Sequence, residues 1–251
     1  MSYTVILPTL NENGHIVKLI QTIEQIFINT KIPYEVLVID DNSTDGTINS
    51  VKEISDKNQN VKIFIREGQK KNLAESINLG IIKSKFSKII WMDADFQHPP
   101  EYIKEIINSS DKFDVIIFSR FLKESIRYFD IQKNQKELNE NQSIFFNKLC
   151  RFLFYNDITD YTSGYICIKK SNLDNYKLNG YYGDYFLSLL IYCKKNNLSI
   201  LELPFKERAR ETGSSKTALK INIKYFYLCI NYFLTLLKNI SVKYFKFKKL
   251  Y

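Results

Sequence analysis

The chain has 251 residues, of which 45% are hydrophobic, and its formal net charge is +9. This length holds one substantial hydrophobic core, and the positive charge fits a partner such as nucleic acid, a membrane surface or a phosphorylated substrate. The four cysteines are widely spaced without a CxxC pair, and there are only two histidines. The composition therefore argues against a structural zinc site or a disulfide framework and favours reduced thiols in a cytosolic-type compartment.

Strand and helix patterns alternate along the first 120 residues. Apolar runs of strand length lie at 3–8, 34–39, 61–66, 89–92 and 115–119, and apolar residues at helical spacing lie at 14–28, 47–54, 74–84 and 101–108. Asn11 or Asn13 is a possible cap for the first of these helices, and Asp45 or Thr47 for the second. The alternation predicts an α/β fold with a doubly wound, mostly parallel sheet and helices on both faces.

The second half of the chain has a weaker pattern. Residues 121–142 are rich in Lys, Asn, Glu and Gln, which predicts a mobile loop of about 20 residues beside the site. We expect an amphipathic aromatic helix at 144–155, extended structure at 162–169 and a strand at 199–203.

Polar clusters follow the predicted strands at 9–12, 40–45 and 93–97 and at Arg120. A doubly wound sheet binds its ligands outside the carboxyl ends of its strands. We therefore expect these clusters to form one composite site.

Two carboxylates, Asp93 and Asp95, come directly after the apolar run 88–92. Placing both at the end of a buried strand is costly unless a positive charge lies between them. Their hard oxygen ligands suit Mg²⁺ or Mn²⁺, which proteins often hold with one or two carboxylates and substrate phosphates. The alternative is an acidic turn that caps the helix starting near residues 99–101.

Asp40 and Asp41 also stand together at a strand end. A carboxylate at this place can accept hydrogen bonds from the ribose or base of a nucleotide, and we assign that role to Asp41. Glu12 is a second possible nucleotide contact, although an acidic residue near a helix N-terminus is also favoured by the helix dipole.

Two later segments contain small, polar or basic residues. Residues 160–165 combine hydroxyl groups with Gly164, so they form either a tight turn or a place where an acceptor approaches the backbone. Residues 208–216 include Arg210, Gly213 and Lys216, which fits a flexible clamp on a diphosphate or an exposed basic loop.

The C-terminal residues 225–251 mix aromatic residues with lysines. This mixture suits a membrane interface with anionic headgroups, or a helix that packs on the core and is followed by a basic tail. The apolar stretch 225–237 is shorter than the roughly 20 residues that a bilayer span needs, and the N-terminus enters a strand without a signal-peptide pattern. We expect a peripheral protein without a transmembrane helix or signal peptide.

Taken together, these motifs resemble the family 2 glycosyltransferases, and among them the dolichyl-phosphate mannose synthase type. The matching stretches occur in family order over residues 3–216. They are 8–12, 40–47, 72–80, 92–99 (Met-Asp-Ala-Asp-Phe-Gln-His-Pro), 119–120, 160–165 and 210–216 (Arg-Glu-Thr-Gly-Ser-Ser-Lys). The stretches 92–99 and 210–216 are specific to the branch that uses lipid phosphates.

The resemblance implies a GT-A fold in residues 1–217, followed by the amphipathic basic segment 218–251. It implies an inverting enzyme with a nucleotide-sugar donor, a polyprenyl-phosphate acceptor and Mg²⁺ or Mn²⁺, working at the cytosolic face of a membrane, in some members with small membrane subunits. The implied metal ligands are Asp93, Asp95 and Gln97, and the implied catalytic residues are Asp93, Asp95, Arg120, Arg210 and Lys216. The implied substrate contacts are Pro8, Leu10, Glu12, Ile39, Asp41, Ala74, Asp93, Ala94, Asp95, Gln97, Arg120, Arg210 and Lys216.

One departure from the family concerns the acceptor. An arginine that the family places shortly before its acceptor-side serine is missing, and Asn139 lies near that position before Ser143. Lys133 or Lys136 could substitute for that arginine.

Several alternatives remain open at this point. GDP-mannose is the first choice of donor, and a UDP-sugar such as UDP-glucose is the close alternative. A polysaccharide or protein acceptor would need a base, for which Asp184 is the nearest candidate, and a non-catalytic nucleotide-sugar-binding protein is a further possibility. Nucleic acid is not expected as a partner, because the basic residues are not interleaved with a nucleic-acid motif.

Overall fold

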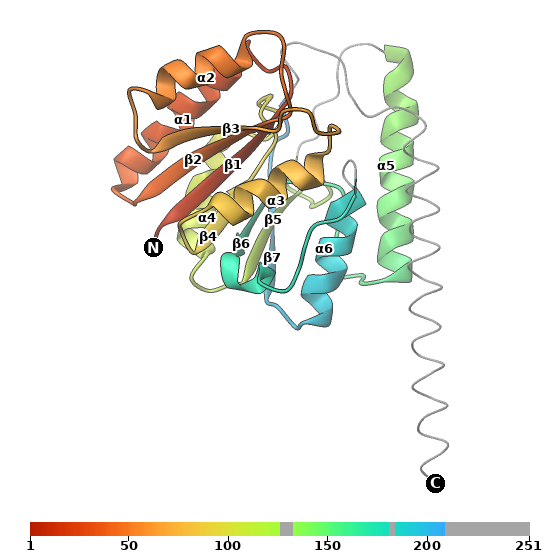
Figure 1. The fold of residues 1–251 in the computed structure, drawn as a ribbon. Coiled ribbons are helices and arrows are strands. Elements are labelled where there is room, and N and C mark those ends of the chain that lie inside the picture. The colour runs from red at the N-terminus through yellow and green to blue at the C-terminus, as the bar shows by residue number, and fades with distance from the viewer. Residues whose placement is uncertain (126–132, 181–183, 209–251) are drawn as a thin grey trace, which may run out of the picture.

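The computed structural model describes residues 1–125, 133–180 and 184–208, and of residues 133–142 it describes the backbone alone. In this part of the chain, strands form one sheet in the order β3-β2-β1-β4-β6-β5-β7 (Figure 1). They are β1 (Tyr3–Thr9), β2 (Tyr34–Asp40), β3 (Val61–Ile65), β4 (Lys88–Trp91), β5 (Val115–Ser119), β6 (Ile166–Lys169) and β7 (Ile200–Pro204).

The strands run parallel except at β6, which is antiparallel to both β4 and β5. The order runs outward from β1 through β2 to β3, and the chain then returns to place β4 on the other side of β1. The expected mostly parallel sheet is therefore confirmed, and its switch point lies between β1 and β4, where such sheets bind ligands.

Helices cover both faces of the sheet. Along β1, Val5 and Leu7 join the core cluster beneath α1 (Ile16–Thr30), α2 (Thr47–Ser55) and α4 (Ile103–Ser109). Ile6 points to the other face, where it joins the cluster beneath α3 (Leu73–Lys83), α5 (Lys133–Leu153) and α6 (Asp184–Lys195). Two short 3-10 helices, η1 (Pro100–Tyr102) and η2 (Lys170–Leu173), complete the described elements. The alternation of side chains along each strand gives the sheet two buried faces.

The predicted caps were partly wrong. The first helix begins after His15, whose side chain makes no capping bond, and the carbonyl of Glu12 accepts the N–H groups of His15 and Ile16 instead. Asn11 and Asn13 bond to the neighbouring turn, where Thr44 N–H and Ser50 Oγ donate to their side chains. At the second helix Asp45 does accept the Thr47 N–H, at 3.0 Å.

The predicted loop at 121–142 was wrong over its second half, because residues 133–142 belong to α5. This stretch contains neither Gly nor Pro and is rich in Lys, Gln and Glu, all of which favour helix. The sequence pattern also missed α6, whose residues 185–193 are nearly all apolar and buried and so lack an amphipathic stripe.

Among the described residues, no helix has both the length and the apolar character that crossing a bilayer requires. The predicted clamp residues Arg210 and Lys216 and the segment 218–251 lie outside the described residues, as do the side chains of Lys133, Lys136 and Asn139. Their roles stay predictions.

Candidate active site

The carboxyl ends of adjacent strands bring the predicted clusters to one edge of the sheet. Thr9 at the end of β1 pairs in register with Asp40 at the end of β2. On the other side of β1, Trp91 ends β4 two residues before Asp93. Arg120 follows β5 at the same edge, since the parallel strands all end there.

Asp40 holds the local structure. It is fully buried, and its carboxylate accepts hydrogen bonds from Thr9 Oγ1 at 3.0 Å and from Ser43 N–H and Oγ, both at 2.7 Å. A buried carboxylate needs such donors to offset its lost hydration. Asp40 therefore joins the ends of β1 and β2 to the turn that follows.

Asp41 fixes the next loop. One carboxylate oxygen pairs with the buried guanidinium of Arg66, and the other accepts the Asn72 N–H at 2.7 Å. Arg66 also donates to the Asn72 carbonyl and to Ser76 Oγ, both at 3.1 Å. Sequence reasoning assigned no role to Arg66, and its position at the end of an apolar run was the signal available.

The other residues expected to contact the donor divide by exposure. Pro8, Leu10 and Glu12 are partly exposed along the end of β1, whereas Ile39 and Ala74 are fully buried and pack in the core. As donor contacts, Ile39 and Ala74 stay predictions, and in this structure they serve the core.

The Asp93–His98 loop has a fixed conformation. His98 Nδ1 accepts the Asp93 N–H at 3.0 Å, and the His98 ring stacks on Tyr165 with centroids 5.1 Å apart. Phe96 takes the left-handed region with φ of 64°, and Asp95 Oδ1 accepts the Gln97 N–H at 3.0 Å. A nitrogen that accepts carries no proton, so in this arrangement His98 orders the turn.

The two aspartates differ in exposure. The Asp93 side chain is 47% exposed, whereas Asp95 is buried together with Ala94. The following 3-10 helix η1 is capped by Pro99 without a side-chain bond. The alternative interpretation of the aspartates as helix caps is therefore not supported.

The donor set at this loop fits a hard divalent cation. Asp93, Asp95 and Gln97 offer carboxylate and amide oxygens, the ligands that Mg²⁺ and Mn²⁺ prefer. Among the described residues, no three His, Cys, Asp or Glu side chains group closely enough to hold a metal. A cation here would complete its coordination with water and with oxygens of its substrate, as Mg²⁺ usually does.

Arg120 lies in a cradle of acceptors. Its Nε and Nη2 donate to the two oxygens of Asp160 at 2.8 and 3.0 Å, and Nη2 also donates to Thr162 Oγ1 at 2.7 Å. Burial opposes both charges, but their mutual attraction outweighs it, so the pKa of Asp160 is lowered and that of Arg120 is raised. Both groups are therefore ionised at neutral pH, and Arg120 is held in one orientation.

Three polar residues that the sequence did not single out surround this cradle. Asn147 of α5 accepts the Tyr161 N–H at 2.6 Å and donates to Thr162 Oγ1 at 3.2 Å. Glu202 of β7 accepts the Thr159 N–H at 2.9 Å, and Glu207 lies 3.9 Å from Arg120 Nη1. Burial raises the pKa of both Glu202 and Glu207. No local pattern marks these residues for the cradle, because the partners they contact there are 14 or more positions away in the chain.

The segment after β7 lies against the Asp93–Gln97 loop. Arg208 N–H donates to the Gln97 carbonyl at 3.3 Å, and Lys206 N–H donates to Tyr102 Oη at 2.9 Å. The Arg208 guanidinium also pairs with Glu101 at 3.0 Å. The described chain thus ends beside the aspartates at Arg208, and Arg210 and Lys216 follow in sequence.

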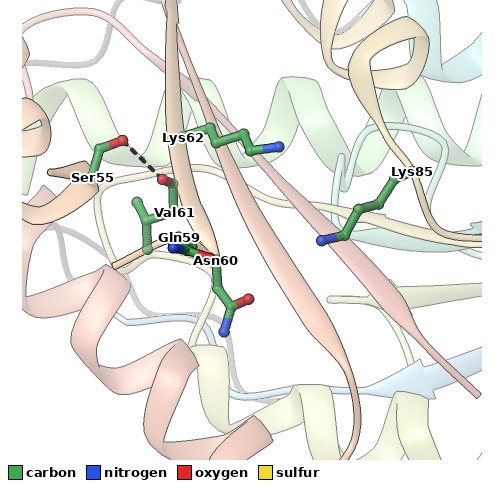
Figure 2. A pocket seen from close by; sticks show the side chains of 6 residues that line it. All are labelled: Ser55, Gln59, Asn60, Val61, Lys62 and Lys85. Atoms are coloured by element: carbon green, nitrogen blue, oxygen red, sulfur yellow. Dashed lines mark hydrogen bonds between the residues drawn. The ribbon is translucent and has the colours of Figure 1, made fainter. Parts of the chain in front are cut away.

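An open pocket lies elsewhere, at the start of β3 (Figure 2). Its lining residues are Ser55, Gln59, Asn60, Val61, Lys62 and Lys85. Val61 begins β3, so the pocket lies at the amino ends of the strands, opposite to Asp93. It is therefore separate from the candidate active site.

Comparisons with known proteins identify the family of the chain. Residues 4–177 match the family described as Glycosyl transferase family 2. The dolichol-phosphate mannosyltransferase of Pyrococcus furiosus is 29% identical over 230 residues, which are 90% of this chain and 62% of that protein. The enzyme of the same name from Mycosarcoma maydis is 24% identical over 89% of this chain and 76% of its own length.

Among solved structures, the fold is similar to glucosyl-3-phosphoglycerate synthase from Mycobacterium tuberculosis. The complex of that enzyme with Mn²⁺, UDP-glucose and phosphoglyceric acid gives a TM-score of 0.69 at 14% identity, over 92% of this chain and 79% of that chain. A second complex, with Mn²⁺, UDP and glucosyl-3-phosphoglycerate, gives a TM-score of 0.64 at 16% identity, over 85% of this chain and 73% of that chain. At this identity the likeness concerns the fold, and it confirms the expected GT-A architecture. Since the family match covers more than half of its residues, the chain belongs to glycosyl transferase family 2.

Proposed function

We propose that this protein transfers a hexosyl group, most simply mannose from GDP-mannose, to a polyprenyl phosphate. The observation that carries the proposal is the bond from Arg208 N–H to the Gln97 carbonyl, which puts the start of the basic segment beside Asp93 and Asp95. Anionic ligands and a cation are thus expected at the same edge of the sheet as Arg120. The names of the Pyrococcus and Mycosarcoma relatives support the acceptor and the sugar.

In this proposal Asp93, Asp95 and Gln97 hold Mg²⁺ or Mn²⁺ against the diphosphate of the donor. When bound, the cation acts as a Lewis acid that offsets the charge on the leaving nucleoside diphosphate. Arg120 presents a fixed positive charge to the sugar-phosphate region, and it needs little reorganisation because Asp160 and Thr162 already orient it. Arg210 and Lys216 are the proposed clamp on the same phosphates.

The acceptor needs no strong general base. A phosphate monoester has its second pKa near ~6, so most of it is dianionic at pH 7 and its oxygen is already a nucleophile. The described site fits this, because His98, which follows the two aspartates, does not have Nδ1 available as a base. That nitrogen accepts a backbone N–H, and the ring stacks on Tyr165. With a lipid acceptor, we also propose a peripheral position of the protein on the cytosolic face of a membrane.

A second candidate uses a UDP-sugar, such as UDP-glucose, with the same acceptor. It is favoured by the solved neighbours, whose complexes contain UDP or UDP-glucose with Mn²⁺. The contact residues expected for the base do not distinguish guanine from uracil, so the donor has to be measured.

The test is transfer of labelled sugar from GDP-mannose or UDP-glucose to a polyprenyl phosphate, with Mn²⁺, Mg²⁺ or a chelator. We expect metal-dependent label in the lipid fraction from one donor, and loss of that transfer in Asp95→Ala. Asp174→Ala, which removes an exposed carboxylate after η2, is the matched control and should keep wild-type activity. Full activity of a folded Asp95→Ala enzyme would refute the assignment of the metal ligands.

A further inference from the structure

We propose that Glu207 occupies the place of a substrate phosphate beside Arg120 and turns away when that phosphate binds. The carboxylate thus limits how tightly the site holds a phosphate-bearing substrate. The inference rests on the proposed function in one respect, since that function supplies two such substrates, a nucleoside-diphosphate sugar and a prenyl phosphate.

Arg120 has one nitrogen left for a ligand. Its Nε and Nη2 donate to Asp160 and Thr162. In the part of the chain that the structure describes, no acceptor forms a hydrogen bond with Nη1. The Arg120 side chain is only 19% exposed, and a donor that is mostly removed from water is costly without an acceptor. An anion at Nη1 would therefore complete the contacts of this arginine.

Glu207 lies at this nitrogen without satisfying it. Its Oε1 is 3.9 Å from Arg120 Nη1, which exceeds the roughly 2.7–3.2 Å of an N–H···O hydrogen bond. The two charges attract each other across this distance, but no hydrogen bond joins them. Glu207 therefore has the position of a bound anion and lacks the bonds of one.

The Glu207 carboxylate is itself poorly accommodated. Its side chain is 15% exposed, and no described residue donates a hydrogen bond to it. Burial raises the pKa of this carboxyl, and the charges of Arg120 and His98 offset that rise only in part. A carboxylate in such a place regains hydration when it turns toward solvent. Its displacement by a phosphate therefore costs little.

Asp160, the other carboxylate on Arg120, shows what a structural partner looks like in the same cradle. It is fully buried and accepts Nε and Nη2 of Arg120 at 2.8 and 3.0 Å. It also accepts the backbone N–H groups of Arg120 and Thr162 at 3.1 and 3.0 Å. Asp160 therefore holds the arginine in place, and Glu207 contributes none of these bonds.

The backbone on both sides of Glu207 is held, so its side chain is the part that can move. Lys206 N–H donates to Tyr102 Oη at 2.9 Å. Arg208 N–H donates to the Gln97 carbonyl at 3.3 Å. Rotation of the Glu207 side chain alone exposes the guanidinium nitrogen to a ligand and leaves both backbone bonds intact.

The charges at this edge of the sheet oppose a phosphate while Glu207 is in place. Asp93 acts electrostatically on both Arg120 and Glu207, so these three groups lie near one another. Like charges a few ångströms apart repel each other, most strongly where water is largely excluded. Removal of the Glu207 charge should therefore raise the affinity of the site for phosphate.

The test is the binding of two kinds of phosphate ligand to the full wild-type chain and to Glu207→Gln, which keeps the shape of the side chain and removes its charge. Isothermal titration calorimetry with GDP or UDP and Mn²⁺ covers the donor. Titration with citronellyl phosphate, a short water-soluble prenyl phosphate, covers the acceptor. Glu101→Gln is the matched control, because it removes the same charge from a pair with Arg208 that is about half exposed.

We expect Glu207→Gln to bind at least one of the two kinds of ligand about tenfold more tightly, and Glu101→Gln to change affinity by less than about twofold. The ligand that gains affinity is the one whose phosphate contacts Arg120. Its KM in the transfer assay should fall while kcat does not rise, because the repulsion acts on bound substrate and transition state alike. Without ligand, the melting temperature of Glu207→Gln should not fall.

Three outcomes would overturn the proposal. The first is that Glu207→Gln binds neither ligand, or binds both with the affinity of wild type. The second is that Glu207→Gln melts at lower temperature without a gain in affinity, which would make the contact with Arg120 a structural ion pair. The third is that Glu101→Gln gains as much affinity as Glu207→Gln, which would assign the effect to net charge.

The transfer assay separates this proposal from the proposed function. Tighter binding by Glu207→Gln, together with absence of sugar transfer by wild type, would refute the function and leave the role of Glu207. Sugar transfer by wild type, together with equal affinities of the two proteins, would refute the role of Glu207 and leave the function.

Discussion

Asp160 is fully buried and Arg120 is mostly buried beside it, and their pairing decides how the site can use the arginine. Burial alone would drive both groups toward their neutral forms. The two hydrogen bonds from Arg120 to the oxygens of Asp160, and the attraction between the two charges, favour the charged form of each group. Glu207 Oε1 lies 3.9 Å from Nη1, the remaining nitrogen of the Arg120 guanidinium. The cradle therefore orients Arg120 before any ligand arrives.

Asp160→Asn should destabilise the protein strongly. It leaves the mostly buried Arg120 charge without its bidentate acceptor, and breaking a buried pair costs about 3–5 kcal/mol. The free energy of unfolding measured in urea checks this. Glu101→Gln is the control, because the Glu101–Arg208 pair is about half exposed on both sides and its loss should cost less than about 1 kcal/mol. Equal effects of the two variants would contradict the buried role of Asp160.

Glu202 should make stability depend on pH in a defined direction. Its pKa is raised by burial in the folded protein, so the folded state holds its proton more tightly than the unfolded state. Its contribution is therefore fully present below the unfolded pKa and is lost as pH rises through the folded pKa. We expect the unfolding free energy of wild type minus that of Glu202→Gln to fall as pH rises from about 4 to neutral.

The measurement for Glu202 is urea unfolding of both proteins across that pH range. Glu202→Gln also changes the acceptors for Thr159 and Asp160 N–H, but glutamine does not titrate, so its own contribution is the same at every pH. The slope of the difference therefore isolates the carboxyl group. A difference that is constant, or that grows with pH, would contradict the raised pKa.

At the scale of elements, α3 packs unusually close to β1 at one position. A Cβ added at Gly80 would lie 2.5 Å from Ile6 Cγ2 and 2.9 Å from Ile6 Cδ1. We expect Gly80→Ala to destabilise by about 1–3 kcal/mol from overcrowding, reduced by the roughly 1 kcal/mol that Ala gains over Gly in a helix.

A double-mutant cycle with Ile6 checks this contact. Ile6→Ala removes the crowding atoms, so the double variant should lose less unfolding free energy than the sum of the single variants. Ile6→Val keeps Cγ2, the nearest atom, and is the matched control in which Gly80→Ala should still be harmful. Strict additivity with Ile6→Ala would show that the helix moves away instead.

The elements that the sequence predicted well are those whose pattern is local. β1, β2 and β5 are apolar runs with clear ends, and α1 shows its buried stripe from Ile16 to Phe27 directly in its spacing. The sequence pattern missed α6 and the first half of α5, because α6 is apolar on nearly every side and residues 133–142 are polar apart from Leu138. Helical spacing gives no signal in either case.

For the candidate site, the sequence singled out Asp93, Asp95 and Arg120. It did not single out the residues that hold the surrounding loops in place. Arg66, Asn147 and Glu202 each act across a distance in sequence, through bonds that exist only once the sheet has formed. The second role of Asp40, joining Thr9 to Ser43, also depends on the register of β1 with β2. Such roles follow from tertiary structure and not from local spacing.

At the scale of the whole molecule, the candidate site draws on both halves of the sheet. Its residues run from Pro8 at the end of β1 to Arg208 after β7, and the antiparallel strand β6 joins β4 to β5 between them. A ligand that contacts Asp93 and Arg120 together therefore bridges strands that are distant in sequence. Unfolding of either half would release such a ligand, so binding should stabilise the entire described fold.

Nucleoside diphosphate with Mn²⁺ should consequently raise the melting temperature. At a ligand concentration about one hundred times Kd the gain is about 2.7 kcal/mol, or roughly 5–10 °C for a chain of this size. We expect GDP to give this shift, because a mannosyltransferase of the proposed kind binds GDP, and UDP to give it if the second candidate function is correct. Chelation of the metal or Asp95→Ala should remove most of the shift, because the diphosphate would then face the acidic loop without a cation between them. Asp174→Ala should keep the full shift. A shift that survives both chelation and Asp95→Ala would show that the nucleotide binds without metal at Asp93 and Asp95, and the proposed role of these two carboxylates would be wrong.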